Sequence, residues 1–74
     1  MQHYDKNGIL LKCGVDVLFP NYYGKQKLGR VMSILPTCLK VFTTFEYYVD
    51  GKKVAGEGVF PVVPSDCEVM YAST

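Results

Sequence analysis

The stretch CLKVFTTFEYYVDGKKVAGEGVFPVV, residues 38–63, decides the fold that this sequence predicts. Its first half alternates strictly between two faces and is rich in β-branched and aromatic residues, which is typical of a strand. One face carries Leu39, Val41, Thr43, Phe45, Tyr47 and Val49. Asp50 and Gly51 follow, a pair that tolerates the positive φ angles of a type I′ turn. We therefore predict a long strand over 38–50, a tight turn, and a returning strand over 52–63.

The returning strand contains two glycines and ends in prolines. Gly56 and Gly58 leave gaps in its side-chain rows, and they predict a bulge or a sharp bend of the sheet. Pro61 lacks the N–H that a central strand needs, so Pro61 and Pro64 place this strand at an edge of the sheet. An exposed edge at 59–63 is able to accept a strand from another chain.

Shorter apolar runs predict the remaining strands. We expect short strands over 9–13 and 15–19, and Pro20 ends the second of them. The residues of that second run that share one face are Val15, Val17 and Phe19. A further strand is expected over 28–35, and a short closing strand over 69–71.

The chain shows no stretch of helical periodicity, and only one helical turn is predicted. Ser65 and Glu68 have the spacing of a capping box, which favours a single turn over 65–68. Residues 1–8 are polar and predict a loose N-terminal tail, so the domain spans 9–71. The fold class is all-β, and the arrangement resembles a small five-stranded SH3/Tudor-like barrel with one short helical turn near 65–68.

Length and charge narrow the classes of function. A chain of 74 residues has room for one domain. Surface scaling predicts marginal stability, which a dimer or a partner surface would improve. The net charge of +1 gives no global attraction to nucleic acid or to anionic membranes, so any basic site must be local. The longest apolar runs are too short to span a membrane, and no membrane partner is expected.

Residue types that carry catalysis or bind metals are few. His3 lies in the polar tail, and Cys13, Cys38 and Cys67 form no CxxC or CxxH pair, so we expect no metal site and no cofactor. Cys67 lies between two acidic residues, which predicts a raised thiol pKa, opposite to what a nucleophile needs. The polar start of the chain does not resemble a signal peptide. We therefore expect buried, reduced thiols in a cytoplasmic protein that is not an enzyme.

The segment LFPNYYGKQKLGRV, residues 18–31, contains a candidate binding loop over 19–30. Tyr22 and Tyr23 are adjacent, so at least one ring is exposed if the segment is extended. The loop also holds three of the eight basic residues of the chain, which are Lys25, Lys27 and Arg30. Aromatic rings beside cations suit a protein-binding surface, and they equally suit base stacking with phosphate contacts. The third interpretation is a solvated loop in which one buried tyrosine covers the barrel.

Phe42 and Tyr48 lie on the second face of the long predicted strand. We expect them in the core, because a strongly coiled barrel packs such residues beneath its second sheet. If they are exposed instead, they form with Lys40 and Glu46 a patch that suits a partner or a second copy. Tyr48 is therefore a further candidate partner-binding residue.

Three segments share a pattern with a known family; they are GVDVLFP at 14–20, GKQKLGRVMSI at 24–34 and VFPVVPSDCEVM at 59–70. They resemble the RNA-polymerase-interacting module of CarD-like regulators and of the transcription-repair coupling factor. In that family a Gly-Asp-x-Val-x-x-Pro strand precedes a His-Gly-x-Gly loop. Here Asp16 is displaced by one position, and Tyr22-Tyr23-Gly24 stands where the family has its His-Gly pair. The resemblance implies a small barrel with a regulatory role directed at RNA polymerase or another protein.

These observations predict a non-catalytic interaction module that binds a protein partner through loop 19–30. Tyr22 and Tyr23 would be the anchors, and the basic residues of the loop would attract the partner electrostatically and lie at the rim of the contact. Nucleic-acid binding through the same loop is the alternative. A structural homo-oligomer held by Phe42, Tyr48 or the 59–63 edge is a further alternative.

Overall fold

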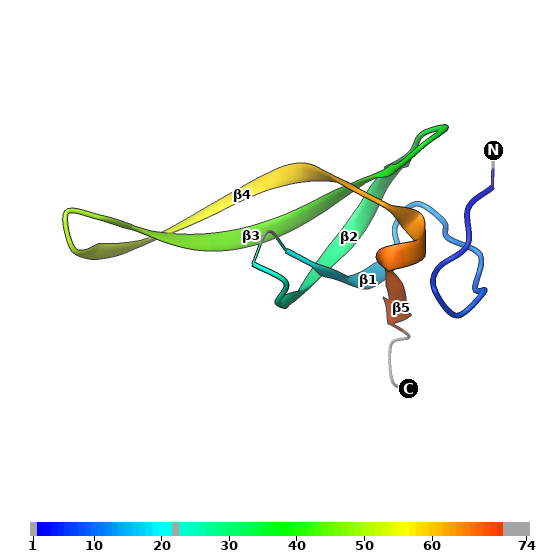
Figure 1. The fold of residues 1–74 in the computed structure, drawn as a ribbon. Coiled ribbons are helices and arrows are strands. Elements are labelled where there is room, and N and C mark those ends of the chain that lie inside the picture. Colours follow the sequence, from blue (N-terminus) through cyan, green and yellow to red (C-terminus); the bar gives the residue numbers. More distant parts are fainter. Residues whose placement is uncertain (1, 22, 71–74) are drawn as a thin grey trace.

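The computed structural model describes residues 2–21 and 23–70, and the predictions that concern Tyr22 and Tyr71 lie outside these residues. The described chain forms one antiparallel sheet of five strands in the order β4-β3-β2-β1-β5. The strands are β1 (Asp16–Pro20), β2 (Gln26–Ile34), β3 (Leu39–Val49), β4 (Lys52–Val62) and β5 (Glu68–Met70). A single 3₁₀ turn, η1 (Pro64–Asp66), separates β4 from β5. The all-β, five-stranded fold with one short helical turn is thus confirmed (Figure 1).

The β3–β4 hairpin forms as the sequence predicts. Asp50 and Gly51 have φ angles of 51° and 77°, as a type I′ turn requires, and the two strands pair without interruption from Val49↔Lys52 to Leu39↔Val62. The predicted bulge at Gly56 and Gly58 is therefore wrong. The register shift of the sheet lies instead in β2, between Val31 and Ser33, where β2 pairs with β3.

Packing explains why position 56 is a glycine. A Cβ at this position would lie 2.6 Å from Cε2 of Phe45 and 3.2 Å from Cε1 of Tyr47. The two rings thus lie over the Gly56 backbone, and this glycine supplies room for them where the sequence suggested a bend.

Alternate residues of the strands turn to one side and bury a compact apolar core. Its members are Leu11, Val17, Phe19, Val31, Leu39, Val41, Val62, Cys67 and Val69. Because both edge strands contribute, Val62 from β4 and Val69 from β5, the sheet is coiled around a single core. Val15 packs against this core, so the predicted common face of Val15, Val17 and Phe19 is confirmed.

Only the first half of β3 reaches that core. Leu39, Val41 and Thr43 are buried, whereas every residue from Glu46 to the turn is exposed. Figure 1 shows the far half of the β3–β4 hairpin extending well away from the other strands. The expectation that Phe42 and Tyr48 belong to the core is therefore wrong. Phe42 is half-buried on the outer face, and the side chain of Tyr48 is 73% exposed because no second layer covers the projecting hairpin.

The N-terminal segment is bound to the sheet, in contrast to the loose tail that its polarity suggested. Asp5 is buried, and the backbone N–H of Lys6 donates to the carbonyl of Cys67 at 2.9 Å. The predicted strand over 9–13 does not form; only Leu10 pairs, in an isolated bridge with Tyr4. Leu11 is nevertheless one of the most completely buried side chains.

The helical turn is held by proline and backbone bonds, and the predicted capping box is wrong. The turn begins with Pro64 after Val63, with no side-chain cap, and Ser65 lies inside it. Proline suits the first helical position because its missing N–H would have no partner there. Glu68 belongs to β5, so it is not placed to complete a capping box.

The three cysteines are free, but they are not all buried. Cys67 is buried in the core, Cys38 is half-buried, and Cys13 is exposed. In the described part of the chain, no helix is long and apolar enough to cross a membrane.

Candidate functional site

The turn between β1 and β2 is an ordered hairpin loop organised by Asn21. The side-chain carbonyl oxygen of Asn21 accepts hydrogen bonds from the backbone N–H groups of Tyr23 and Lys25, each at 2.9 Å. The Asn21 N–H donates to the carbonyl of Lys25 at 2.7 Å, and Gly24 takes a positive φ of 78°. This use of an Asn side chain to hold its own turn is a common local device. The candidate loop is therefore an ordered turn that its own hydrogen bonds hold in place.

A concavity of about 650 Å³ lies between this turn and the base of the β3–β4 hairpin. Its apolar walls come from β1 and the turn that follows it, and from β3, β4 and the residue after β4: Phe19, Pro20, Tyr23, Phe45, Phe60, Pro61, Val62 and Val63. Its polar lining consists of Asn21, Lys27, Thr43, Glu46 and Asp66. A largely apolar hollow with a few polar groups is the usual character of a protein's binding site.

Two rings from neighbouring strands form the hairpin side of this concavity. Phe45 and Phe60 meet edge to face, with ring centroids 5.9 Å apart and planes at 74°. The continuous β3–β4 register puts both side chains on the core face of the hairpin, beyond the point where the core ends. Phe60 is 41% exposed, so an occupant of the concavity can reach it.

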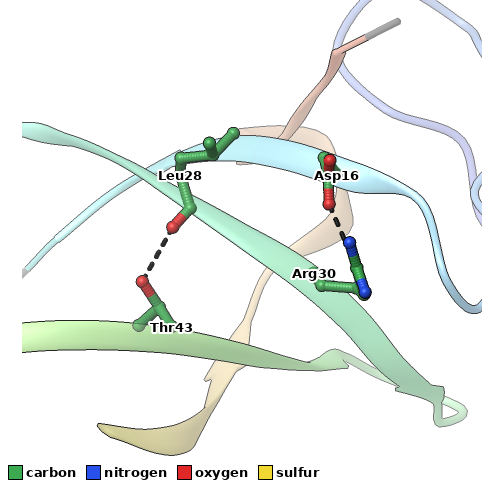
Figure 2. A network of polar contacts seen from close by, with 4 residues as sticks. All are labelled: Asp16, Leu28, Arg30 and Thr43. Atoms are coloured by element: carbon green, nitrogen blue, oxygen red, sulfur yellow. Dashed lines mark hydrogen bonds and ion pairs between the residues drawn. The ribbon is translucent and has the colours of Figure 1, made fainter. Parts of the chain in front are cut away.

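The lining of the concavity contains one buried polar side chain, Thr43, and its hydroxyl has a hydrogen-bond partner. Thr43 donates from Oγ1 to the carbonyl of Leu28 at 2.8 Å, which links β3 to β2 (Figure 2). No buried side-chain nitrogen or oxygen of the described residues lacks a hydrogen-bond partner. The concavity therefore offers apolar contact and exposed polar groups rather than a buried polar atom aimed at a ligand.

The structure divides the predicted basic cluster between the two faces of the sheet. Tyr23 and Lys27 both line the concavity, and the side chain of Tyr23 is 82% exposed. Lys25 lies exposed in the turn beside them. Arg30 lies on the opposite face of β2, where its Nε donates to Oδ1 of Asp16 at 3.2 Å (Figure 2). Since β2 already begins at Gln26, alternation along the strand separates Lys27 from Arg30.

Tyr48 is also separated from the concavity. It lies in the projecting half of β3, on the face opposite to Phe45, as alternation along a strand requires. Near the base of the same outer face, Leu28, Arg30, Phe42 and Thr44 border a shallower hollow of about 380 Å³. The exposed aromatics thus belong to two surfaces, one on each face of the sheet.

The metal-ligating residue types of the described chain are dispersed. No group of three His, Cys, Asp or Glu side chains among them is placed to hold a metal ion. His3 contacts the carbonyl of Leu35 through Nε2 at 2.7 Å, which attaches the N-terminal segment to the end of β2. Burial, with the charges of Asp66 and Asp5, raises the pKa of Cys67 to about 11. The predicted direction of that pKa change is confirmed.

Sequence reasoning identified Tyr23 and Lys27 but missed the hairpin side of the concavity. Phe45 and Phe60 were placed on strands, yet their meeting was not anticipated. The Asp50-Gly51 turn carried the needed signal, because a two-residue turn fixes the register and hence which side chains become neighbours. No known family, no curated protein and no solved structure matches this chain.

Proposed function

We propose that this chain is a non-catalytic module that binds a protein partner in the concavity between the β1–β2 turn and the base of the β3–β4 hairpin. The observation that carries the proposal is the grouping of Tyr23, Phe45 and Phe60 around one apolar hollow, in which Tyr23 and Phe60 are exposed and Phe45 is half-buried. Exposed aromatic side chains in a concave site are the usual anchors of protein recognition. Lys27 on one side and Asp66 on the other add polar groups that orient a partner.

A regulatory, cytoplasmic role is part of the proposal, and it rests on the resemblance of the 14–20, 24–34 and 59–70 segments to CarD-like modules. Under that resemblance the partner would be a subunit of RNA polymerase. The segments 14–20 and 59–70 contribute Phe19, Phe60 and Pro61 to the concavity, so the resembling residues and the proposed contact overlap.

Nucleic-acid binding remains the alternative, and one observation favours it. Tyr23 and Lys27 line the concavity and Lys25 is exposed in the same turn, which would allow a base to stack on the ring while the lysines contact phosphates. Arg30, on the other face and paired with Asp16, would not join that contact.

The test is affinity capture from lysate followed by titration of the purified partner. Tyr23→Ala should weaken binding at least about tenfold, because it removes an exposed anchor. Tyr48→Ala is the matched control: it removes the same side chain, also largely exposed, from the opposite face of the sheet, and it should leave binding unchanged.

Salt dependence separates the two kinds of partner. Protein recognition through apolar contacts should tolerate high salt, whereas nucleic-acid binding should weaken steeply as salt is added. In the second case, Lys25→Ala and Lys27→Ala should each reduce the slope of log binding constant against log salt concentration by about one. Equal loss of binding in the Tyr23 and Tyr48 variants would show that the concavity is not the contact site.

A further inference from the structure

The outer edge of β4 is an open strand edge. β4 is the last strand of the sheet, and no strand of the described chain pairs with its outer side. A two-residue type I′ turn closes with a hydrogen-bonded pair, here Val49 and Lys52. Hydrogen-bonded and non-hydrogen-bonded pairs then alternate along the hairpin, so the backbone groups of Lys53, Ala55, Glu57 and Val59 point away from β3.

Protection of this edge is confined to the base of the hairpin, at the end of β4 remote from the Asp50-Gly51 turn. Pro61 also occupies an outward position, where its missing N–H costs no bond to β3 and blocks pairing with another strand. The seven residues 53–59 contain no proline, and the stretch 53–55 pairs with the exposed part of β3 that projects from the sheet. Natural proteins normally block such an edge or use it. The opposite edge of the sheet, β5, is only three residues long.

The charges on this edge are complementary to a second copy of the same edge. In an antiparallel pair with Ala55 opposite Ala55, Lys53 of each chain lies directly opposite Glu57 of the other. A pair centred on Glu57 would instead place like charges together and set Lys53 opposite Pro61, which cannot donate. One register is therefore favoured over its neighbour by electrostatics and by hydrogen bonding.

The apolar face of the hairpin fits the same register. The rings of Phe45 and Tyr47, with centroids 5.9 Å apart, lie over Gly56 and so reach the outer edge of the sheet. With Ala55 at the centre, Val54 of the second copy lies opposite Gly56 and packs against these rings, and the contact repeats on the other side of the dyad. Tyr47 is 44% exposed in the single chain, so this contact covers apolar surface that water otherwise reaches.

An ion pair within the chain already holds Lys53 on the face that the pairing uses. Its Nζ lies 2.8 Å from Oε2 of Glu46 on the neighbouring strand. Both side chains are largely exposed, and such a pair contributes little by itself. In the paired edge it becomes part of a row formed by Glu46, Lys53 and Glu57 of the second copy.

From these observations we propose that two copies of this chain pair through the outer edges of their β4 strands, antiparallel and centred on Ala55. The occupant of the edge is thus a second copy, and the two sheets form one continuous ten-stranded sheet. The dyad is perpendicular to that sheet, so both concavities open on the same side, and under the proposed function the dimer would be bivalent. The inference does not rest on the proposed function, because the pairing uses backbone groups on the edge remote from Tyr23.

Sedimentation velocity across roughly 1 μM to 1 mM tests the pairing. The mass of the wild-type protein in solution should rise with concentration from 8.3 kDa, that of one chain, to about twice that value. Lys53→Glu and Glu57→Lys should each weaken dimerisation at least about tenfold, because each places two like-charged pairs across the dyad. The double exchange should restore the dimer. Lys52→Glu is the matched control: it makes the same charge change on the other face, opposite Gly58, and should leave the dimer intact.

A second variant keeps the test valid if a charge exchange disturbs folding. Ala55→Pro removes one outward N–H without removing a bond to β3, so it should give a folded monomer at every concentration, with an unchanged far-ultraviolet circular dichroism spectrum. A wild-type protein that stays monomeric up to the highest concentration overturns the proposal. So does a dimer that survives Ala55→Pro or is indifferent to the charge exchanges.

Discussion

The carboxylate of Asp5 accepts a hydrogen bond of 2.8 Å from the backbone N–H of Val69, 64 positions further along the chain. The second carboxylate oxygen accepts from the N–H groups of Asn7 and Ile9, at 2.9 and 2.8 Å. One buried side chain thus holds the N-terminal segment in its turn and fastens it to the last strand. Carboxylates that accept several backbone N–H bonds are among the stronger buried polar contacts.

Asp5→Ala should therefore destabilise the protein by about 3 kcal/mol, because three backbone donors lose their acceptor at once. Urea unfolding monitored by circular dichroism measures this change. Asp66→Ala is the control, since Asp66 is exposed and its removal should alter the free energy of unfolding by less than about 0.5 kcal/mol. Similar values for the two variants would contradict the structural role given to Asp5.

The same carboxylate makes stability depend on pH in acid. Burial raises the pKa of Asp5, but the bonds from Val69, Ile9 and Asn7 and the charge of Lys6 outweigh burial and lower it below its ordinary value of 3.8. A depressed folded-state pKa gives a contribution to stability that is complete above 3.8 and is lost as pH falls through the folded-state value. Unfolding free energies measured from pH 6 downward should thus fall less steeply for Asp5→Asn than for wild type.

The β3–β4 hairpin was predictable because its signals are local. Strict alternation identified the strand, and Asp50-Gly51 fixed both the turn and the register. Asp5 was not predictable, because its partners lie at both ends of the chain and its neighbours are polar. Local polarity indicated a tail, whereas long-range hydrogen bonds of Asp5, Lys6 and His3 determine where that segment lies.

Two errors arose from residues whose types have more than one structural use. Gly56 was interpreted as part of a bulge or a sharp bend, but a glycine is needed there because the Phe45 ring lies against its backbone. Lys27 and Arg30 were interpreted as one basic loop, but β2 begins at Gln26 and separates them by face. Avoiding the first error requires knowing that the Phe45 ring lies against Gly56. The second followed from placing the start of one strand two residues too late.

Gly29 provides a direct test of packing between β2 and its neighbours. A Cβ there would lie 2.5 Å from Cγ1 of Val41, 2.8 Å from the carbonyl oxygen of Phe42 and 2.9 Å from Cε1 of Phe19. Gly29→Ala should cost about 2–3 kcal/mol, since both backbone and core must shift. Gly58→Ala is the matched control, because its Cβ would meet ring carbons no closer than 3.4 Å. It should be neutral or slightly stabilising, and a larger loss at Gly58 than at Gly29 would refute this packing.

The three thiols should differ sharply in reactivity, and the order follows from burial. Cys13 is exposed, Cys38 is half-buried, and Cys67 is buried with its Sγ 3.6 Å from the carbonyl oxygen of Val63. With a pKa of about 11, Cys67 is ionised in only about one molecule in a thousand at pH 8, and the thiolate is the reactive form. Iodoacetamide at pH 8 should label Cys13 first and Cys67 last, with rates that differ by at least about a hundredfold. Peptide mapping by mass spectrometry measures the order, and labelling in urea, where all three should react alike, is the control. Rapid labelling of Cys67 in the folded protein would show that the core around β5 opens far more readily than its burial indicates.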